Sequence, residues 1–221
     1  MTQQSRWLLV CLLLLSTAVG CGQTTKPQST TSPQAASPSS PDSPQAGWQT
    51  MQGNGVRLSL PASYEGGNPS NPKDLDAIAQ KLKAIDPKYA NRIESLKQNP
   101  SALNLLAFDT QKAKSGFLTN VNITAEKVPA GTTVEQYLDA AVKQLSGQFQ
   151  VVDQKVVSLE KYQAGRVVAE TTAGGIPIKQ LFYFVQNGNN FWLVTYSTSK
   201  NEFDQRLPNF EQSIRTFTLP S

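Results

Sequence analysis

The chain has 221 residues, a formal net charge of +4 and 38% hydrophobic residues, a composition that suits one globular domain with a sizeable core. It contains no histidine, so catalytic sites of the Ser-His-Asp or Cys-His type and histidine-based zinc sites are excluded. Basic and acidic side chains are interspersed along the chain, whereas nucleic-acid binders concentrate their basic residues, so a nucleic-acid partner is not expected.

The first segment of the chain is typical of a secretory leader. A polar start carrying Arg6 precedes an apolar run over residues 7–19, and small residues lead from this run to Cys21. The run has 13 residues, which is too short for a transmembrane helix because crossing the bilayer core takes ~20. Two interpretations remain: a leader followed by a lipid-attachment cysteine, and an ordinary secretory leader in which the cysteine is incidental.

Gly20 followed by Cys21 resembles the lipobox of bacterial lipoproteins. In that family the leader is removed before the cysteine, the thiol receives a diacylglyceryl group, and the new amine is acylated. The resemblance implies cleavage between Gly20 and Cys21, and acyl chains on Cys21 that anchor the protein stably to a membrane. The expected location is the periplasmic face or a thylakoid lumen. Because Cys11 leaves with the leader, no thiol remains for a disulfide or a metal site.

Residues 22–46 consist mainly of Ser, Thr, Pro, Gln and Ala, without a large apolar side chain. Such a segment cannot offset its ordering entropy by burying surface, so we expect a disordered linker. Its prolines favour an extended chain of up to ~3.1 Å per residue. A proline-rich motif for a partner domain is the alternative. The expected organisation is a signal peptide over 1–20, the lipidated cysteine and linker over 21–46, and a single globular domain over 47–221.

The globular part begins near Trp48. Apolar and polar residues alternate over 56–60, which predicts a half-buried strand. Pro61 ends this strand, and a turn rich in Gly and Asn is expected over 62–71.

Residues 72–98 predict a helical insert in two pieces. Asn71 can cap the first piece and Pro72 suits its first turn, while Asp86 and Pro87 restart the same pattern. Apolar residues recur at helical spacing, which indicates a face that packs on the core; a groove for a partner is the alternative. The apolar stripes are Leu75, Ile78, Leu82 and Ile85 in the first piece, and Tyr89, Ile93 and Leu96 in the second.

Two strands are expected next, over 103–108 and 118–127, joined by a polar loop that includes residues 110–116. In the second strand the apolar face alternates with a face of Asn and Thr side chains. Lys112 and Lys114 in the loop are candidates for contact with an acidic partner or with anionic headgroups. The alternative is a solvated loop without a role in binding.

Two further helices carry recognisable start signals. Thr132 and Glu135 spell a capping box for a helix that Gly147 is placed to end. Residues 199–202 spell another capping box before a C-terminal helix, which Pro208 is expected to kink or split. Each helix has one apolar stripe and is therefore expected to cover a sheet.

Between these helices the sequence predicts an antiparallel meander with short turns at Gln163-Ala164-Gly165, at Gly174-Gly175 and at the Asn-Gly pair of residues 187–188. The last two strands are apolar on both faces, so they are expected to be central strands covered from both sides. The four strands are expected over residues 149–162, 164–173, 178–186 and 191–197.

The order of elements from Leu103 to Phe217 resembles the PsbP-like α/β/α sandwich: a short strand, the strand beginning Asn120-Val121-Asn122-Ile123, a helix, the meander and a closing helix with a Phe-rich face. The resemblance implies an α+β fold in which helices cover both faces of an antiparallel sheet. Its members include extrinsic photosystem II proteins and lipid-anchored DcrB- and LpqN-type proteins, most of them non-catalytic and docked onto another macromolecule. The insert at 72–98 departs from that pattern.

The function expected from these observations is that of a lipid-anchored, extracytoplasmic accessory protein without catalytic activity, metal or cofactor. It would bind another macromolecule, with the insert 72–98 and the loop 110–116 as candidate surfaces, and a photosystem II-type role is expected if the source is cyanobacterial. The alternative is a lipoprotein that binds a small apolar or lipid ligand in a cleft between the sheet and the insert, with Tyr183, Trp192 and Tyr196 as candidate lining residues. The other interpretation of these three aromatics is that they fill the core. An enzyme is disfavoured because no acid–base or nucleophile arrangement is present.

Overall fold

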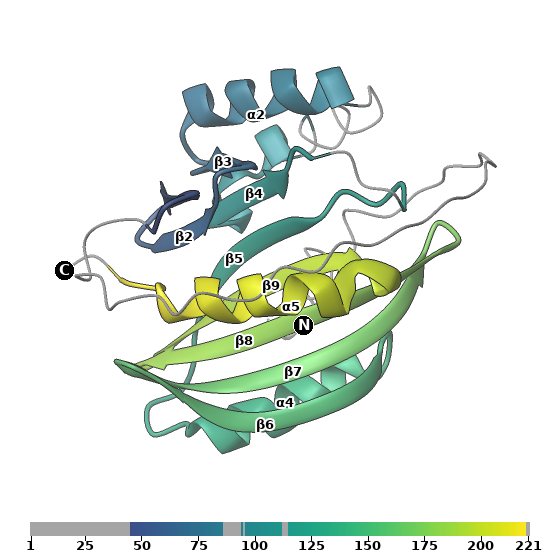
Figure 1. Cartoon of the computed structure of the whole chain (residues 1–221). Helices are drawn as coiled ribbons and strands as arrows, with labels where there is room; N and C mark the ends of the chain where they lie inside the picture. The colour runs from purple at the N-terminus through teal and green to yellow at the C-terminus, as the bar shows by residue number, and fades with distance from the viewer. Residues whose placement is uncertain (1–44, 86–93, 95, 112–114, 220–221) are drawn as a thin grey trace.

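The computed structural model describes residues 45–85, 94, 96–111 and 115–219. The predicted leader, the lipidation site Cys21 and nearly all of the predicted linker lie outside the described residues, as does most of the second half of the insert. The first strand, β1 (Trp48–Gln52), begins two residues after the expected end of the linker. The element order then alternates short strands and helices before a long four-strand meander (Figure 1).

Seven strands form the main sheet, in the order β3-β4-β5-β9-β8-β7-β6, and every neighbouring pair is antiparallel. The long strands β7, β8 and β9 come from the meander, which confirms that part of the prediction. The strands are β3 (Tyr64–Gly67), β4 (Leu105–Asp109), β5 (Asn120–Lys127), β6 (Gln150–Leu159), β7 (Tyr162–Ala173), β8 (Ile176–Asn187) and β9 (Asn190–Ser199).

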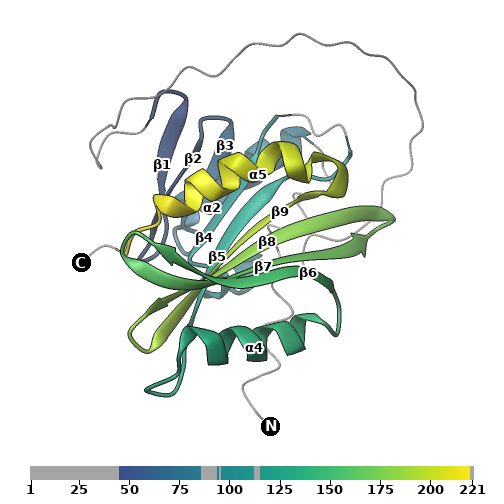
Figure 2. The same ribbon diagram turned by 60° about the horizontal axis from the view of Figure 1, so that its bottom comes forward.

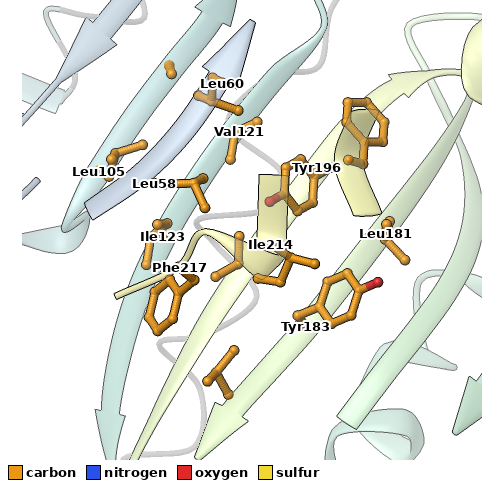
Figure 3. Packing of buried hydrophobic residues seen from close by; sticks show 14 of the residues in the cluster. Leu58, Leu60, Leu105, Val121, Ile123, Leu181, Tyr183, Tyr196, Ile214 and Phe217 are labelled. Carbon is orange, nitrogen blue, oxygen red and sulfur yellow. The ribbon is translucent and has the colours of Figure 1, made fainter. Parts of the chain in front are cut away.

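One face of the sheet is covered by the C-terminal helix α5 (Lys200–Arg215) and by the small sheet of β1 and β2 (Arg57–Pro61) (Figures 1 and 2). Leu58 and Leu60 of β2 meet Val121 and Ile123 of β5 in this layer (Figure 3). The largest hydrophobic cluster lies here, and it draws side chains from segments far apart in the sequence. This layer therefore joins the N-terminal hairpin to the meander.

The opposite face carries two separate clusters. The helix α4 (Val134–Leu145) packs on β7, β8 and β9 through residues such as Leu138 and Phe182. The helix α2 (Pro72–Ile85) packs at the other end, where Leu75 and Ile78 meet Leu106 of β4. Helices thus cover both faces, as the sequence predicted. Leu75, Ile78 and Leu82 of the α2 stripe belong to the core rather than to a groove for a partner, whereas Ile85 at the end of the stripe is 38% exposed.

The turns of the meander follow the predicted chemistry at two of three positions. Gly174 and Gly175 have φ of 55° and 82°, a left-handed geometry that glycine adopts without steric cost. Gly188, with φ of 57°, lies in the turn between β8 and β9. The turn predicted at 163–165 is wrong, because β6 and β7 connect through residues 160–161 and their register pairs Leu159 with Tyr162.

Four local predictions are corrected by the structure. The predicted turn 62–71 contains the edge strand β3. The capping box of α4 uses Thr133 and Gln136 rather than Thr132 and Glu135. The N-cap residue of α5, Ser199, makes no side-chain capping bond. Pro208 does not split α5, which runs unbroken from Lys200 to Arg215.

Candidate functional site

The least expected feature of the sheet is a strip of buried polar side chains between the α2 and α4 clusters. By the pairing register, Asn120 of β5 faces Ser197 of β9, which faces Gln180 of β8. Each of these residues is at most 5% exposed, a degree of burial that uncharged polar side chains seldom reach. We call this strip the polar seam; its residues are Asn120, Asn122, Gln180, Thr195, Ser197 and Ser199.

The hydrogen bonds of the polar seam are incomplete. Gln180 Nε2 donates to Ser197 Oγ at 2.6 Å, and Asn120 Nδ2 donates to the Leu118 carbonyl at 3.0 Å. Four buried side-chain oxygens of the polar seam have no partner within the described part of the chain: Asn120 Oδ1, Gln180 Oε1, Thr195 Oγ1 and Ser199 Oγ. Leaving a buried polar atom unpaired costs about 1–3 kcal/mol, so this concentration calls for bound water or a ligand.

The chemistry of the polar seam is neutral, because it is made of amide and hydroxyl groups. Such groups both donate and accept hydrogen bonds, so they suit water or an uncharged polar ligand. The loop before β5 borders the polar seam: Phe117 packs on Ile178 at the end of β8, and Leu118 joins the α2 cluster.

The layer under α5 contains an ionic network at one end of the sheet. Arg206 of α5 donates from Nη1 to Asp109 Oδ2 at 2.6 Å and from Nε to Glu202 Oε2 at 3.0 Å. Burial raises the pKa of Tyr64, and the nearby Asp109 carboxylate raises it further, so this phenol stays neutral. The network joins α5 to β4, so these charged side chains serve to hold the fold together.

A second ionic network holds the other half of α5. Arg166 of β7 is 6% exposed and donates to Asp153 of β6 at 2.6 Å and to Glu211 of α5 at 3.0 Å. Burial raises the pKa of the adjacent Tyr183. A buried guanidinium needs such partners because its desolvation is costly, so these carboxylates are engaged in holding the fold.

A shallow hollow of about 420 Å³ lies where α4 begins. It is lined by the first turn of α4 and by the β8–β9 turn, and Gln186 Nε2 reaches across it to the Thr132 carbonyl at 2.8 Å. The Thr133 hydroxyl accepts a hydrogen bond from the Gln136 amide at 3.3 Å. The side-chain cap thus takes an amide that would otherwise be offered to a ligand.

The aromatic residues predicted to line a ligand cleft beside the insert do not do so. Tyr183, Trp192 and Tyr196 point to the α5 face of the sheet, opposite to the face that α2 covers. Tyr196 is fully buried, stacks on Phe210 with ring centroids 4.9 Å apart and donates to Ser213 Oγ at 3.0 Å. Figure 3 shows Tyr183 and Tyr196 within this packed layer. They belong to the core cluster, which agrees with the interpretation that they fill the core and not with the cleft of the alternative function.

The other predicted site residues lie outside the described residues: Gly20, Cys21, Lys112 and Lys114. The polar seam was not predicted from the sequence. The alternation of Asn and Thr with apolar residues over β5 gave its two faces correctly, but a polar face of a strand is ordinarily taken to be solvent-exposed. The burial of that face was the missing information.

Two features are absent from the described residues. No group of three or more His, Cys, Asp and Glu side chains is placed to hold a metal ion among these residues. In the same part of the chain, none of the helices combines the length and the apolar composition needed to cross a membrane.

The sequence matches no family model and no curated protein. Among solved structures, the fold is similar to LpqN of Mycobacterium tuberculosis, described as involved in cell envelope biogenesis, with a TM-score of 0.52 and 12% identity over 78% of this chain and 91% of that chain. It is also similar to cyanobacterial PsbP from Synechocystis sp. PCC 6803, with a TM-score of 0.48 and 10% identity over 82% and 98% of the two chains. The likeness to LpqN supports the expected PsbP-like fold, and it concerns the fold alone.

Proposed function

We propose that this protein is a non-catalytic accessory protein that is held to the outer side of a membrane by lipid on Cys21 and binds another macromolecule. The observation that carries the proposal is the order of its parts. A leader ending in Gly20-Cys21 is followed by a polar, proline-rich segment, and regular structure begins at Trp48. An anchor, a spacer and a folded domain are the parts that an anchored docking module needs.

The charges inside the domain agree with a docking role rather than with catalysis. Arg206 and Arg166 join α5 to the sheet through carboxylates at 2.6–3.0 Å, so these ionic groups stabilise packing. The described fold resembles that of LpqN, a protein described as involved in cell envelope biogenesis. An envelope location for this chain is part of the proposal, and it is consistent with the leader.

The anchor is tested by fractionation of cells that express Cys21→Ser. We expect this variant in the soluble extracytoplasmic fraction, because the acyl chains supply the membrane affinity. The matched control is Cys11→Ser, which makes the same change inside the leader and should leave the protein in the membrane fraction. If Cys21→Ser still sediments with membranes as the unmodified chain does, the anchor is refuted.

The partner is tested by crosslinking in native membranes, followed by mass spectrometry. A single stoichiometric partner is the expected result, and recovery of the monomer alone would contradict the proposal. The contribution of the loop 110–116 is measured with Lys112→Glu combined with Lys114→Glu, which should reduce the yield if the partner is acidic. Lys161→Glu, in the turn between β6 and β7, is the control for a change of charge elsewhere.

A second candidate function is binding of a neutral polar ligand at the polar seam, favoured by its four unpaired oxygens. Thr195→Val tests it because the change removes an unpaired hydroxyl and keeps the side-chain shape. If a ligand occupies the polar seam, native mass spectrometry should show an added mass that this variant loses. If the polar seam is empty, Thr195→Val should instead stabilise the fold by about 1 kcal/mol, since an unpaired buried hydroxyl is removed.

A further inference from the structure

The strand β6 forms one edge of the main sheet, and its outer side is open. Among the described residues, β6 pairs with β7 alone, and it lies at the rim of the sheet in Figures 1 and 2. The other edge strand, β3, has only four residues, whereas β6 has ten. Alternate residues of a strand direct their backbone N–H and C=O groups to opposite neighbours, so β6 presents a long row of such groups to the outside.

The exposed side chains of β6 include apolar ones. Val152 is 51% exposed and Val156 is 38% exposed, and they are two of the three large hydrophobic residues exposed in the described chain. A long edge strand with exposed valines is a template for pairing with another strand. The open edge of β6 can therefore pair with one further strand.

The sequence of β6 is complementary to itself when it is read in the opposite direction. With Gln154 at the centre, an antiparallel second copy places Asp153 opposite Lys155 and Val152 opposite Val156. Asp153 and Lys155 pair with Val168 and Arg166 of β7 and so lie on one face of the sheet. The complementary stretch ends at the β-bulge between Val151 and Asp153, because Val151 packs with the α4 cluster and Val157 with the α5 cluster, on opposite faces. At the centre, acid meets base on both sides of Gln154, and pairs of this kind stabilise antiparallel strands.

Two features of β6 also occur in edge strands that avoid pairing. The register with β7 shifts between Val151 and Asp153, which is a β-bulge, and Lys155 places a charge on the edge. A protective edge, however, repels a second copy of itself, as a row of lysines does. Here the acid and the base lie one on each side of the centre, so a second copy is attracted. Asp153 Oδ2 accepts from Arg166 at 2.6 Å, and its side chain is 47% exposed, so it is accessible to the Lys155 of another chain.

We propose that two copies of this protein associate through antiparallel pairing of β6 with β6 about a two-fold axis at Gln154, which joins their sheets into one. The interface is isologous, so each acid–base pair occurs twice. One strand a side is a small contact area, and we expect weak association in dilute solution. Confinement at a surface or a high local concentration would raise the dimer fraction. The proposal does not depend on the lipid anchor or on a macromolecular partner.

The pairing register is tested by thiol crosslinking of the full chain in native membranes. In the proposed dimer the two Gln154 Cα atoms lie ~5.5 Å apart, so Gln154→Cys should give a dimer with a short bis-maleimide. The matched control is Ser158→Cys, an exposed residue of the same strand. Two copies of Ser158 would lie eight residues apart along the strands, which is roughly 27 Å, so this variant should stay monomeric.

The pairing chemistry is tested by adding a change of charge to Gln154→Cys. Lys155→Asp sets like charges opposite each other at two places and should lower the dimer affinity roughly tenfold. Lys161→Asp makes the same change in charge outside the paired segment and should leave crosslinking unchanged. Thermal unfolding of each variant controls for loss of the fold.

Equal crosslinking of the Gln154 and Ser158 variants would overturn the proposal, since it would report random collision. Equal effects of the changes at Lys155 and Lys161 would also overturn it, as would a Gln154→Cys product that contains a different protein. The chain without an added cysteine is included as a further control. If it crosslinks, the thiol of Cys21 is free and the proposed anchor fails; the β6 test is then repeated with Cys21→Ser.

Discussion

The ion pair between Arg206 and Asp109 offers a quantitative test of how α5 is held on the sheet. The Asp109 side chain is 3% exposed and the Arg206 side chain 21%. Replacing Arg206 with Met keeps most of the apolar stem and removes the charge, which leaves the buried Asp109 carboxylate without its cation. The Asp109 Oδ1 atom still accepts from the Gln111 amide at 3.1 Å, so the carboxylate is not left entirely unpaired.

Breaking a fully buried pair in this way costs about 3–5 kcal/mol. The partial exposure of Arg206 and the remaining bond from Gln111 place the expected loss at the lower end, about 3 kcal/mol. For a domain of this size, 1 kcal/mol corresponds to about 2–4 °C in Tm, so Arg206→Met should lower Tm by roughly 6–12 °C.

The assay is thermal unfolding followed by circular dichroism, with two companion variants. Lys200→Met removes a cation whose side chain is 51% exposed, and it should cost less than about 1 kcal/mol. Adding Asp109→Asn to Arg206→Met removes the stranded charge and should recover part of the lost stability. Equal Tm values for Arg206→Met and Lys200→Met would contradict this account of the ion pair, as would a double variant that is no more stable than Arg206→Met.

Two other predictions concern the sheet and its pH dependence. A Cβ at Gly66 would lie 2.1 Å from the Leu106 carbonyl oxygen of β4, so Gly66→Ala should lower the free energy of unfolding by about 1–3 kcal/mol. The control is Gly147→Ala, whose Cβ would meet its nearest atom at 3.4 Å and which should cost far less. Equal losses of stability for the two variants in urea titration would contradict the clash. The hydrogen bond from Lys200 lowers the pKa of Glu170 below its usual value. A carboxyl group with a lowered pKa stabilises the fold at pH above its unfolded-state pKa, and this stabilisation is lost as the pH falls through its folded-state pKa. Glu170→Gln should therefore flatten the dependence of stability on pH below about pH 4.5, and an unchanged slope would argue against this contribution.

The helices and the meander could be predicted from the sequence because their signals are local. The apolar stripe of α2 at Leu75, Ile78 and Leu82 has helical spacing, and these residues are buried as expected. The two-sided apolar pattern of β8 and β9 required cover on both faces, and the structure provides it through α4 and α5. Spacing of this kind follows from the geometry of one helix or one strand.

Errors arose where the outcome depends on a distant partner. The strand β3 carries two glycines in four residues, which favours a turn, but pairing of Gly66 with Ala107 of β4 makes it an edge strand. The polar side of β5 was indistinguishable from a solvent-exposed face, until the α2 and α4 clusters and the loop at Phe117 enclosed it. For Tyr183 and Tyr196 both a cleft and the core remained open, because the sequence does not say which helix lies over them.

The sequence by itself determined the order of the helices and of the meander strands and the periodicity of each element, because these depend on near neighbours along the chain. Only the tertiary structure decided which face each helix covers, which polar side chains are enclosed in the polar seam, and that β6 rather than a central strand is left at an open edge. Those outcomes depend on pairing and burial between segments far apart in the sequence. The free energy that favours them comes from apolar surface removed from water when these segments pack together, and no single segment can bury that surface alone.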